Sequence, residues 1–288
     1  MINYDPHRWM DHFFDIRGSL VKEILGRVLL CTTWSAGVVY FHVYIHPIAI
    51  PSIVHTLVGL ALGLLLVFRT NASYDRFWEG RKLWGGIVNE TRNLIRSSEA
   101  FLINAPEIRH EIASWMLAFV YGSMNALRDK KSFGPIENRL PPEKLKAAME
   151  APHPALFAAK QISLLLQKAK SEGHITDYVQ ATIDQNVQLL VDYIGGCERI
   201  HKTPLPFAYV VHLRRALVIY CFTLPFALVG SFEWPWATIL DTLFLAYIFF
   251  GIEEIGVEIE DPFGEDENDL PLETICASIE KNTMGLLS

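Results

Sequence analysis

The sequence predicts an all-α integral membrane protein with four transmembrane helices and a cytoplasmic helical bundle. Three observations support this fold class: four long apolar runs, basic residues on one side of those runs, and helical apolar spacing in the polar middle of the chain. Of the 288 residues, 51% are hydrophobic and 20% are charged, which fits a membrane part joined to a sizeable polar part. The net charge of −7 argues against a nucleic-acid partner, which calls for a basic face.

The four apolar runs are each close to the roughly 20 residues that a helix needs to cross the hydrocarbon of a bilayer. We place these spans at about 24–46, 50–68, 212–232 and 234–253. The fourth span contains Asp241, which is costly in hydrocarbon, and we assign its carboxylate to the interface or to a helix–helix hydrogen bond. A fifth uncharged run is shorter and contains several polar residues, so we assign it to a buried helix of the soluble part; it covers residues 112–127.

Basic residues indicate the orientation of the spans. Lys and Arg precede the first span, follow the second and precede the third, whereas the short connectors between paired spans have none. By the positive-inside rule, both termini and the segments of about 69–209 and 254–288 are cytoplasmic. We treat residues 1–288 as a single domain.

The long cytoplasmic segment has the pattern of a helical bundle. Thr176 can cap a helix whose following residues form one apolar stripe. Pro106 and Pro154 stand where helices are expected to begin, because proline is tolerated in the first helical turn. Residues 129–142 are predicted to form a loop.

The segment after the fourth span is dense in carboxylates. Six of the ten residues from Glu260 to Asp269 are acidic, and they surround the turn Pro262-Phe263-Gly264. Such a turn can direct several carboxylates at one point, and oxygen ligands without nearby Cys or His suit calcium. The alternative is a solvated acidic linker.

The second span carries an apolar stripe. Leu60, Leu64 and Phe68 recur once per helical turn, with Gly59 and Gly63 beside them. Packing is the usual explanation of such a stripe, and small residues four apart let a neighbouring helix approach closely.

Two Glu-x-x-His pairs, Glu107/His110 and Glu198/His201, raise an enzymatic alternative. Carboxylate-bridged di-iron sites combine two such pairs with further glutamates on other helices. Further glutamates are available at Glu90, Glu254 and Glu258. A membrane-associated di-iron enzyme is therefore the alternative function, although Glu107 is also explained as a first-turn acid favoured by the helix dipole.

Several phrases of the sequence, in the same order along the chain, resemble the bestrophin family and its bacterial branch in particular. They are Arg17-Gly18-Ser19, Phe68-Arg69-Thr70-Asn71-Ala72-Ser73-Tyr74-Asp75-Arg76-Phe77, Gly195-Gly196-Cys197-Glu198-Arg199, Thr203-Pro204-Leu205-Pro206-Phe207-Ala208-Tyr209, Leu224-Pro225-Phe226-Ala227-Leu228-Val229 and Asp261-Pro262-Phe263-Gly264-Glu265-Asp266. Because they extend from near the amino terminus to the acidic segment, the resemblance covers nearly the whole chain.

The resemblance implies a homopentamer in the bacterial plasma (inner) membrane, around a central pore through which monovalent ions pass passively. It implies no catalysed reaction and no required cofactor. Chloride and other anions are the ions best known for the family, and monovalent cations are attributed to its bacterial members. The implied partners are further copies of this chain, the lipid bilayer and the ions.

The resemblance also implies roles for individual residues. Leu60, Leu64 and Phe68 match the apolar neck of the pore, and Tyr178 is the position closest to the cytoplasmic aperture. The carboxylates that match the family's calcium ligands are Glu265, Asp266 and Asp269. Bacterial members are regarded as calcium-independent, so the alternative role of these carboxylates is to brace neighbouring subunits.

Overall fold

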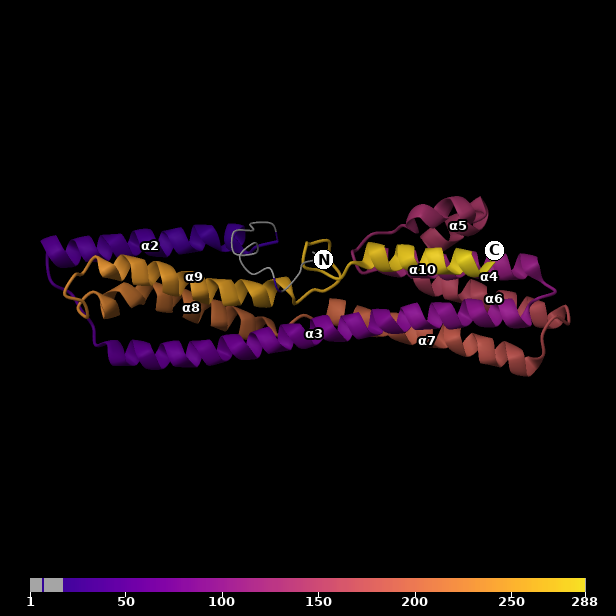
Figure 1. Cartoon of the computed structure of the whole chain (residues 1–288), viewed down its shortest axis with the longest axis horizontal. Coiled ribbons are helices and arrows are strands. Elements are labelled where there is room, and N and C mark those ends of the chain that lie inside the picture. Colours follow the sequence, from indigo (N-terminus) through magenta and orange to yellow (C-terminus); the bar gives the residue numbers. More distant parts are fainter. Residues whose placement is uncertain (1–6, 8–17, 288) are drawn as a thin grey trace. The chain divides into compact units, whose positions relative to one another are not determined.

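The computed structural model describes residue 7 and residues 18–287, which form helices and their connecting segments and contain no β-strand (Figure 1). The chain divides into two compact units. Unit 1 comprises Met1–Phe77 and Pro204–Asp261, and unit 2 comprises Trp78–Thr203 and Pro262–Ser288. The division does not fall at the ends of the predicted spans, because the residues that directly follow the second and fourth spans pack within unit 1.

Unit 1 is a bundle of long apolar helices (Figure 1). Its helices are α2 (Val21–Tyr44), the first part of α3 (Ser52–Phe101), α8 (Phe207–Leu228) and α9 (Ala237–Glu258). Each contains one of the four predicted spans, with ends shifted by a few residues. The buried core that joins them consists of Ile24, Val28, Cys31, Leu62, Leu66, Leu213, Leu217, Tyr220, Cys221, Leu224, Ala246 and Phe250.

Among the described helices, α2, α3 and α8 are long and apolar enough to cross a membrane. The fourth predicted span lies in α9, which differs because it carries Asp241 near its start and Glu253 and Glu254 near its end. Only 17% of the apolar segment of α3 is buried within the chain, so most of that segment requires a cover of lipid or of other subunits.

Helix α3 is longer than the sequence pattern predicts, because it does not end with the apolar run at Phe68. It continues to Phe101, for 50 residues in all. Charged residues end the part of a helix that can lie in hydrocarbon, but they do not end the helix, and no proline interrupts this stretch. Hydropathy alone therefore predicted the apolar part of the helix and missed the length of the whole helix.

Unit 2 is a second helical bundle. Together with the end of α3 it contains α4 (Pro106–Ala126), the 3₁₀-helix η1 (Gly134–Arg139), α5 (Pro142–Glu150), α6 (Pro154–Ser171), α7 (Asp177–Lys202) and α10 (Leu272–Leu287). Helix α4 is buried from Ile112 to Asn125 except at Ser114, which confirms that the fifth uncharged run is a core helix. The prediction of a loop over 129–142 was wrong in its middle, where η1 forms.

The sequence correctly predicted several helix ends of unit 2. Helices α4 and α6 begin at Pro106 and Pro154. The side-chain oxygen of Thr176 accepts a hydrogen bond from the backbone N–H of Val179 at 3.4 Å, as expected of a helix cap. The buried face of α7 contains Ile183, Val187, Leu190 and Ile194.

Candidate functional site

One face of α3 in unit 1 carries large apolar side chains that the chain itself leaves uncovered. Leu60, Leu64 and Phe68 are 75%, 55% and 56% exposed. On the other side of the same helix, Leu62 and Leu66 are buried in the core. The structure thus places Leu60, Leu64 and Phe68 on one face of α3 that the chain leaves uncovered.

The two glycines beside this face differ in their surroundings. A Cβ atom at Gly59 would lie 2.6 Å from the Tyr220 hydroxyl, so the absence of a side chain lets α8 pack closely on α3. The ring of Tyr220 also stacks on His55, with centroids 4.9 Å apart. A Cβ at Gly63 would meet no atom within 4 Å, so this glycine leaves room at the surface of the single chain.

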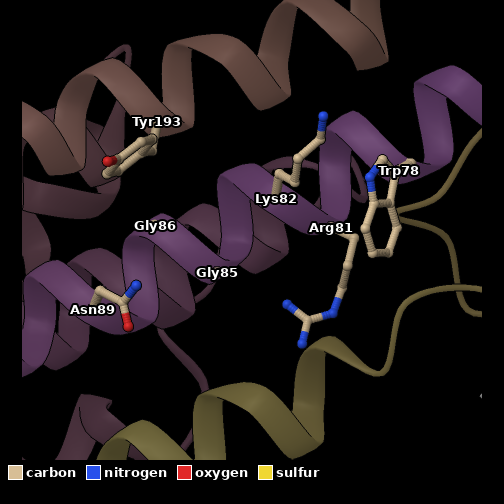
Figure 2. A pocket seen from close by; sticks show the side chains of 7 residues that line it. All are labelled: Trp78, Arg81, Lys82, Gly85, Gly86, Asn89 and Tyr193. Atoms are coloured by element: carbon tan, nitrogen blue, oxygen red, sulfur yellow. The ribbon is translucent and has the colours of Figure 1, made fainter.

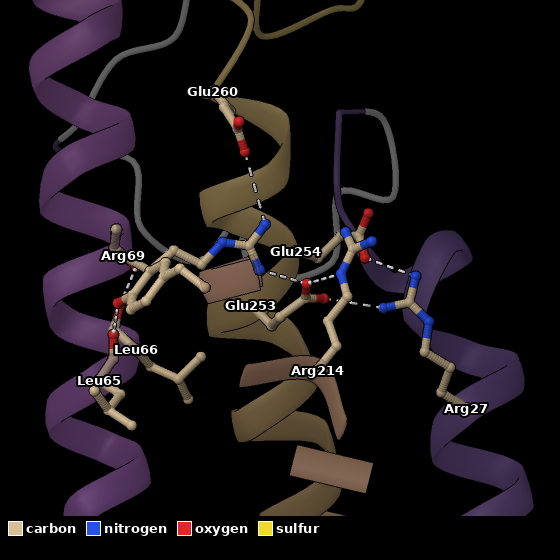
Figure 3. Close-up of polar contacts among 10 residues, drawn as sticks. Arg27, Leu65, Leu66, Arg69, Arg214, Glu253, Glu254 and Glu260 are labelled. Carbon is tan, nitrogen blue, oxygen red and sulfur yellow. Dashed lines mark hydrogen bonds and ion pairs between the residues drawn. The ribbon is translucent and has the colours of Figure 1, made fainter. Parts of the chain in front are cut away.

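Directly after Phe68, unit 1 contains a network of buried charges (Figure 3). Arg69 is 1% exposed and Glu253 is 2% exposed. Nη1 of Arg69 donates to Oε1 of Glu253 at 2.5 Å, and Nε of Arg214 donates to the same oxygen at 2.8 Å. A buried arginine of this kind is stable only when its charge is paired.

The network extends to both sides of Glu253. Arg27 lies 3.3 Å from Oε2 of Glu253 and 2.7 Å from Oε2 of Glu254. Nη2 of Arg69 is 3.8 Å from Oε2 of Glu260. The carboxylates of α9 therefore meet arginines from α2, α3 and α8, which explains how α9 accommodates Glu253 and Glu254 at the end of an apolar run.

This network fixes the rotation of α3 about its axis. Arg69 follows Phe68 in the sequence, so the contact of Arg69 with Glu253 determines the direction in which Phe68 points. A second anchor lies one turn earlier, where the Tyr209 hydroxyl donates to the Leu65 carbonyl at 3.0 Å. We conclude that the free apolar face of α3 is held in a defined orientation within unit 1.

This pairing was not predicted from the sequence, in which the arginines indicate the orientation of the spans and Glu254 is a candidate ligand for iron. The missed signal is that Glu253 and Glu254 end the fourth apolar run while Arg27, Arg69 and Arg214 border the other three on the same predicted side. Opposite charges at one depth in a bundle of spans are expected to pair.

In unit 2, the acidic segment forms a compact turn held by basic side chains. The buried carboxylate of Asp269 accepts a hydrogen bond from the backbone N–H of Asp266 at 2.8 Å. Arg128 donates to the carbonyls of Phe263 and Gly264 at 3.0 and 2.9 Å. These contacts stabilise the turn from within the chain.

Glu265 of the turn and Glu273 of α10 also have cationic partners. Glu265 accepts a hydrogen bond from Lys130 at 2.5 Å, which lowers the pKa of its carboxyl group. Arg128 donates to Glu273 and lowers its pKa in the same way. Within the described part of the chain, no group of three or more His, Cys, Asp or Glu residues is placed to hold a metal, so Glu265, Asp266 and Asp269 do not converge in a single subunit.

Tyr178, the predicted aperture residue, is the second residue of α7 and is 82% exposed. Its side chain belongs to the surface of unit 2, and its backbone carbonyl accepts a hydrogen bond from Thr182 at 2.8 Å. The exposed position leaves the ring available to partners outside the chain.

Comparison with known proteins identifies the family. The family model described as "Bacterial/Fungal Bestrophin protein" matches residues 1–285. The chain belongs to the bestrophin family. A voltage-dependent anion channel-forming protein of Synechocystis sp. is 38% identical over 286 residues, which cover 98% of this chain and 92% of the relative. A protein of the same description from Escherichia coli K12 is 31% identical, over 97% of this chain and 92% of the relative.

Solved structures agree with this assignment. The crystal structure of a bacterial bestrophin homologue from Klebsiella pneumoniae matches with a TM-score of 0.85 at 30% identity, over 92% of this chain and 98% of that one. The all-α fold and the membrane setting predicted from the sequence are therefore confirmed for this bestrophin. Membership of a family of channels also makes it a non-enzymatic protein.

The candidate ligands of the di-iron alternative contact other groups in the structure. His110 Nδ1 lies 2.7 Å from the Pro106 carbonyl, at the exposed start of α4. Glu198 is 2.5 Å from Nε2 of His153. Glu254 pairs with Arg27 in unit 1. These side chains form no set of metal ligands in the described residues of this bestrophin, in agreement with its family.

Proposed function

We propose that this bestrophin is a homopentameric channel that conducts monovalent ions passively, with Leu60, Leu64 and Phe68 as its neck. The observation that carries the proposal is the free apolar face of α3, which the chain leaves uncovered although a charged network holds it in place. The relatives described as anion channel-forming proteins support ion conduction, and the resemblance to bestrophins supports five subunits.

The neck would control ions by dehydration. A narrow apolar passage holds few water molecules, so an ion that enters it loses hydration without gaining ligands. Such a constriction gates by wetting and drying, and it transports ions only down their gradient. With both termini cytoplasmic in the bacterial inner membrane, α3 would carry the path from the neck towards the cytoplasm, and Tyr178 would form the cytoplasmic aperture.

The proposal predicts the assembly and the activity together. Detergent-solubilised protein is expected to have a mass about five times the 32.7 kDa of the chain, measured by light scattering with the detergent subtracted. Reconstituted in liposomes, the same preparation is expected to carry a current whose reversal potential follows the gradient of a monovalent ion. A monomer or dimer in mild detergent, or intact pentamers without current, would contradict the proposal.

Calcium at the acidic turn is a second part of the proposal. A calcium ion takes 6–8 oxygen ligands, so Glu265 and Asp266 would need oxygens from a neighbouring subunit to complete a site. Calcium that binds only the folded assembly is expected to raise stability by about 2.7 kcal/mol at a hundredfold excess over its Kd.

Thermal melting in calcium, in magnesium and in chelator tests this expectation. Calcium alone should raise the melting temperature, and the double variant Glu265→Gln/Asp266→Asn should remove this shift. The control Glu267→Gln, which also removes one negative charge per substituted residue, should keep it. Identical melting temperatures in all three solutions would leave the turn as a link held by Arg128 and Lys130.

A further inference from the structure

Unit 1 contains an open pocket of about 340 Å³ beside the charged network. Its residues come from α2, α8 and α9, and all of them belong to unit 1. The lining residues are Arg27, Arg214, Leu217, Val218, Phe250 and Glu253. The volume lies in the range of about 300–1,000 Å³ that is usual for ligand pockets.

The pocket has a charged end and an apolar end. The side chains of Arg27 and Arg214 are 43% and 52% exposed, so both guanidinium groups reach the surface of the helices. One turn after Arg214, Val218 is 44% exposed, and one turn after Arg27, Leu30 is 58% exposed. An exposed apolar surface therefore begins where the two guanidinium groups end.

The charges of the pocket do not cancel. Arg27 and Arg214 face one carboxylate among the described lining residues, that of Glu253. Glu253 is shared, because it also accepts the hydrogen bond of the buried Arg69. The other carboxylate within reach, Glu254, pairs with Arg27. Three arginines thus meet two carboxylates, and the pocket keeps an excess of positive charge.

Arg214 has free hydrogen-bond donors. Its Nε donates to Oε1 of Glu253 at 2.8 Å. In the part of the chain that the structure describes, its Nη1 and Nη2 have no hydrogen-bond or ion-pair partner. Figure 3 shows Arg27 and Arg214 on the side of Glu253 that is opposite Arg69. The terminal nitrogens of a guanidinium form a planar fork that matches two oxygens of a phosphate group.

We propose that this pocket binds the headgroup phosphate of an anionic phospholipid, whose acyl chain lies along Val218. Basic pockets between transmembrane helices are suited to anionic headgroups. Arginines that border an apolar run extend to the level of the headgroups, where a lipid phosphate is available. The apolar end favours a lipid over a free anion, since a free anion would leave that end uncovered.

A pocket of unit 2 shows what the charged end alone would provide (Figure 2). Arg81 and Lys82 are among its lining residues, but the lining contains no aliphatic side chain. That pocket offers positive charge without a surface for an acyl chain. The combination of both ends therefore distinguishes the pocket of unit 1 as a lipid site.

Thermal melting of the detergent-solubilised, delipidated protein tests the site. Dioleoylphosphatidylglycerol in mixed micelles is expected to raise the melting temperature, because a ligand of the folded state stabilises it. Dioleoylphosphatidylcholine has the same phosphate and chains, but the arginines repel its choline group, so the same shift should require a several-fold larger lipid fraction. Inorganic phosphate alone should give no comparable shift.

Matched variants connect the shift to the pocket. In Arg214→Gln, the phosphatidylglycerol fraction that gives half of the shift is expected to rise about fivefold, whereas Arg69 still holds Glu253. Val218→Trp fills the apolar end without changing an ion pair, so it should also weaken the response, and it decides the test if Arg214→Gln fails to fold. The control Arg215→Gln removes the same charge from the next residue of α8, which is exposed and outside the lining, and it should respond like the wild type.

Four results would overturn the site. The first two are equal responses of the wild type to both lipids and a full response to inorganic phosphate alone. The third is an unchanged phosphatidylglycerol response in folded Arg214→Gln or Val218→Trp. The fourth is an equal loss in Arg215→Gln, which would attribute the preference to diffuse surface charge. The test needs no ion current, so it is independent of the proposed channel function.

Discussion

Replacement of Glu253 by alanine is expected to lower the free energy of unfolding by about 3–5 kcal/mol, because it leaves the buried Arg69 without its close partner. Arg69 is 1% exposed, and its Nε and Nη2 atoms have no hydrogen-bond partner, so the bond from Nη1 to Glu253 is its main compensation. Glu260 is 3.8 Å from Arg69 and is too distant to replace that bond.

Thermal unfolding of the detergent-solubilised protein measures this loss. The matched control is Glu254→Ala, whose partner Arg27 is partly solvated, and it should cost no more than about 1 kcal/mol. The double variant Arg69→Met/Glu253→Met is expected to recover much of the stability, since a buried pair can be replaced by apolar residues of similar volume. A melting temperature unchanged in Glu253→Ala would show that the network does not hold α3.

The same substitution connects stability to function. The Arg69–Glu253 contact sets the direction in which Phe68 points. Loss of this contact should therefore also make the width of the neck variable. We expect Glu253→Ala channels that remain assembled to show heterogeneous conductance levels, whereas Arg69→Met/Glu253→Met, with packing in place of the ion pair, should show fewer levels.

Hydropathy predicted the helices of unit 1 because transfer into hydrocarbon depends on the local run of side chains. The limits for α2 and α8 were correct within a few residues. The extension of α3 to Phe101 was missed because a polar helix leaves no hydropathy signal, and its stability comes from packing partners far away in sequence, such as Tyr193 against Gly86.

The uncovered face of α3 could be predicted because its residues are periodic. Leu60, Leu64 and Phe68 lie on one helix, so their shared face follows from spacing alone. The contact of Arg69 with Glu253 joins residues 184 positions apart, and no local pattern encodes such a pair. The acidic turn shows the same limit of local patterns. Its number of carboxylates suggested a cation site, whereas its contacts with Arg128 and Lys130, from the loop after α4, were not predicted.

Substitution of Leu64 by alanine is expected to raise the ionic current of reconstituted channels about threefold to tenfold. Leu64 is the middle residue of the proposed neck, so a smaller side chain widens the passage, admits water and lowers the dehydration barrier. Each 1.4 kcal/mol removed from a barrier multiplies the rate about tenfold, so even a modest gain in hydration is measurable. Because Leu64 is 55% exposed in the subunit, its truncation should leave the fold largely intact.

Two controls distinguish a pore position from a lipid-facing or core position. Leu30 of α2 is 58% exposed, and Leu30→Ala should leave the current unchanged if that side chain faces lipid. Leu66 is fully buried, and Leu66→Ala should cost about 2–5 kcal/mol of stability without opening the neck. An unchanged current in stable Leu64→Ala pentamers would place Leu64 against lipid, and the free face of α3 would then belong to the bilayer and not to the pore.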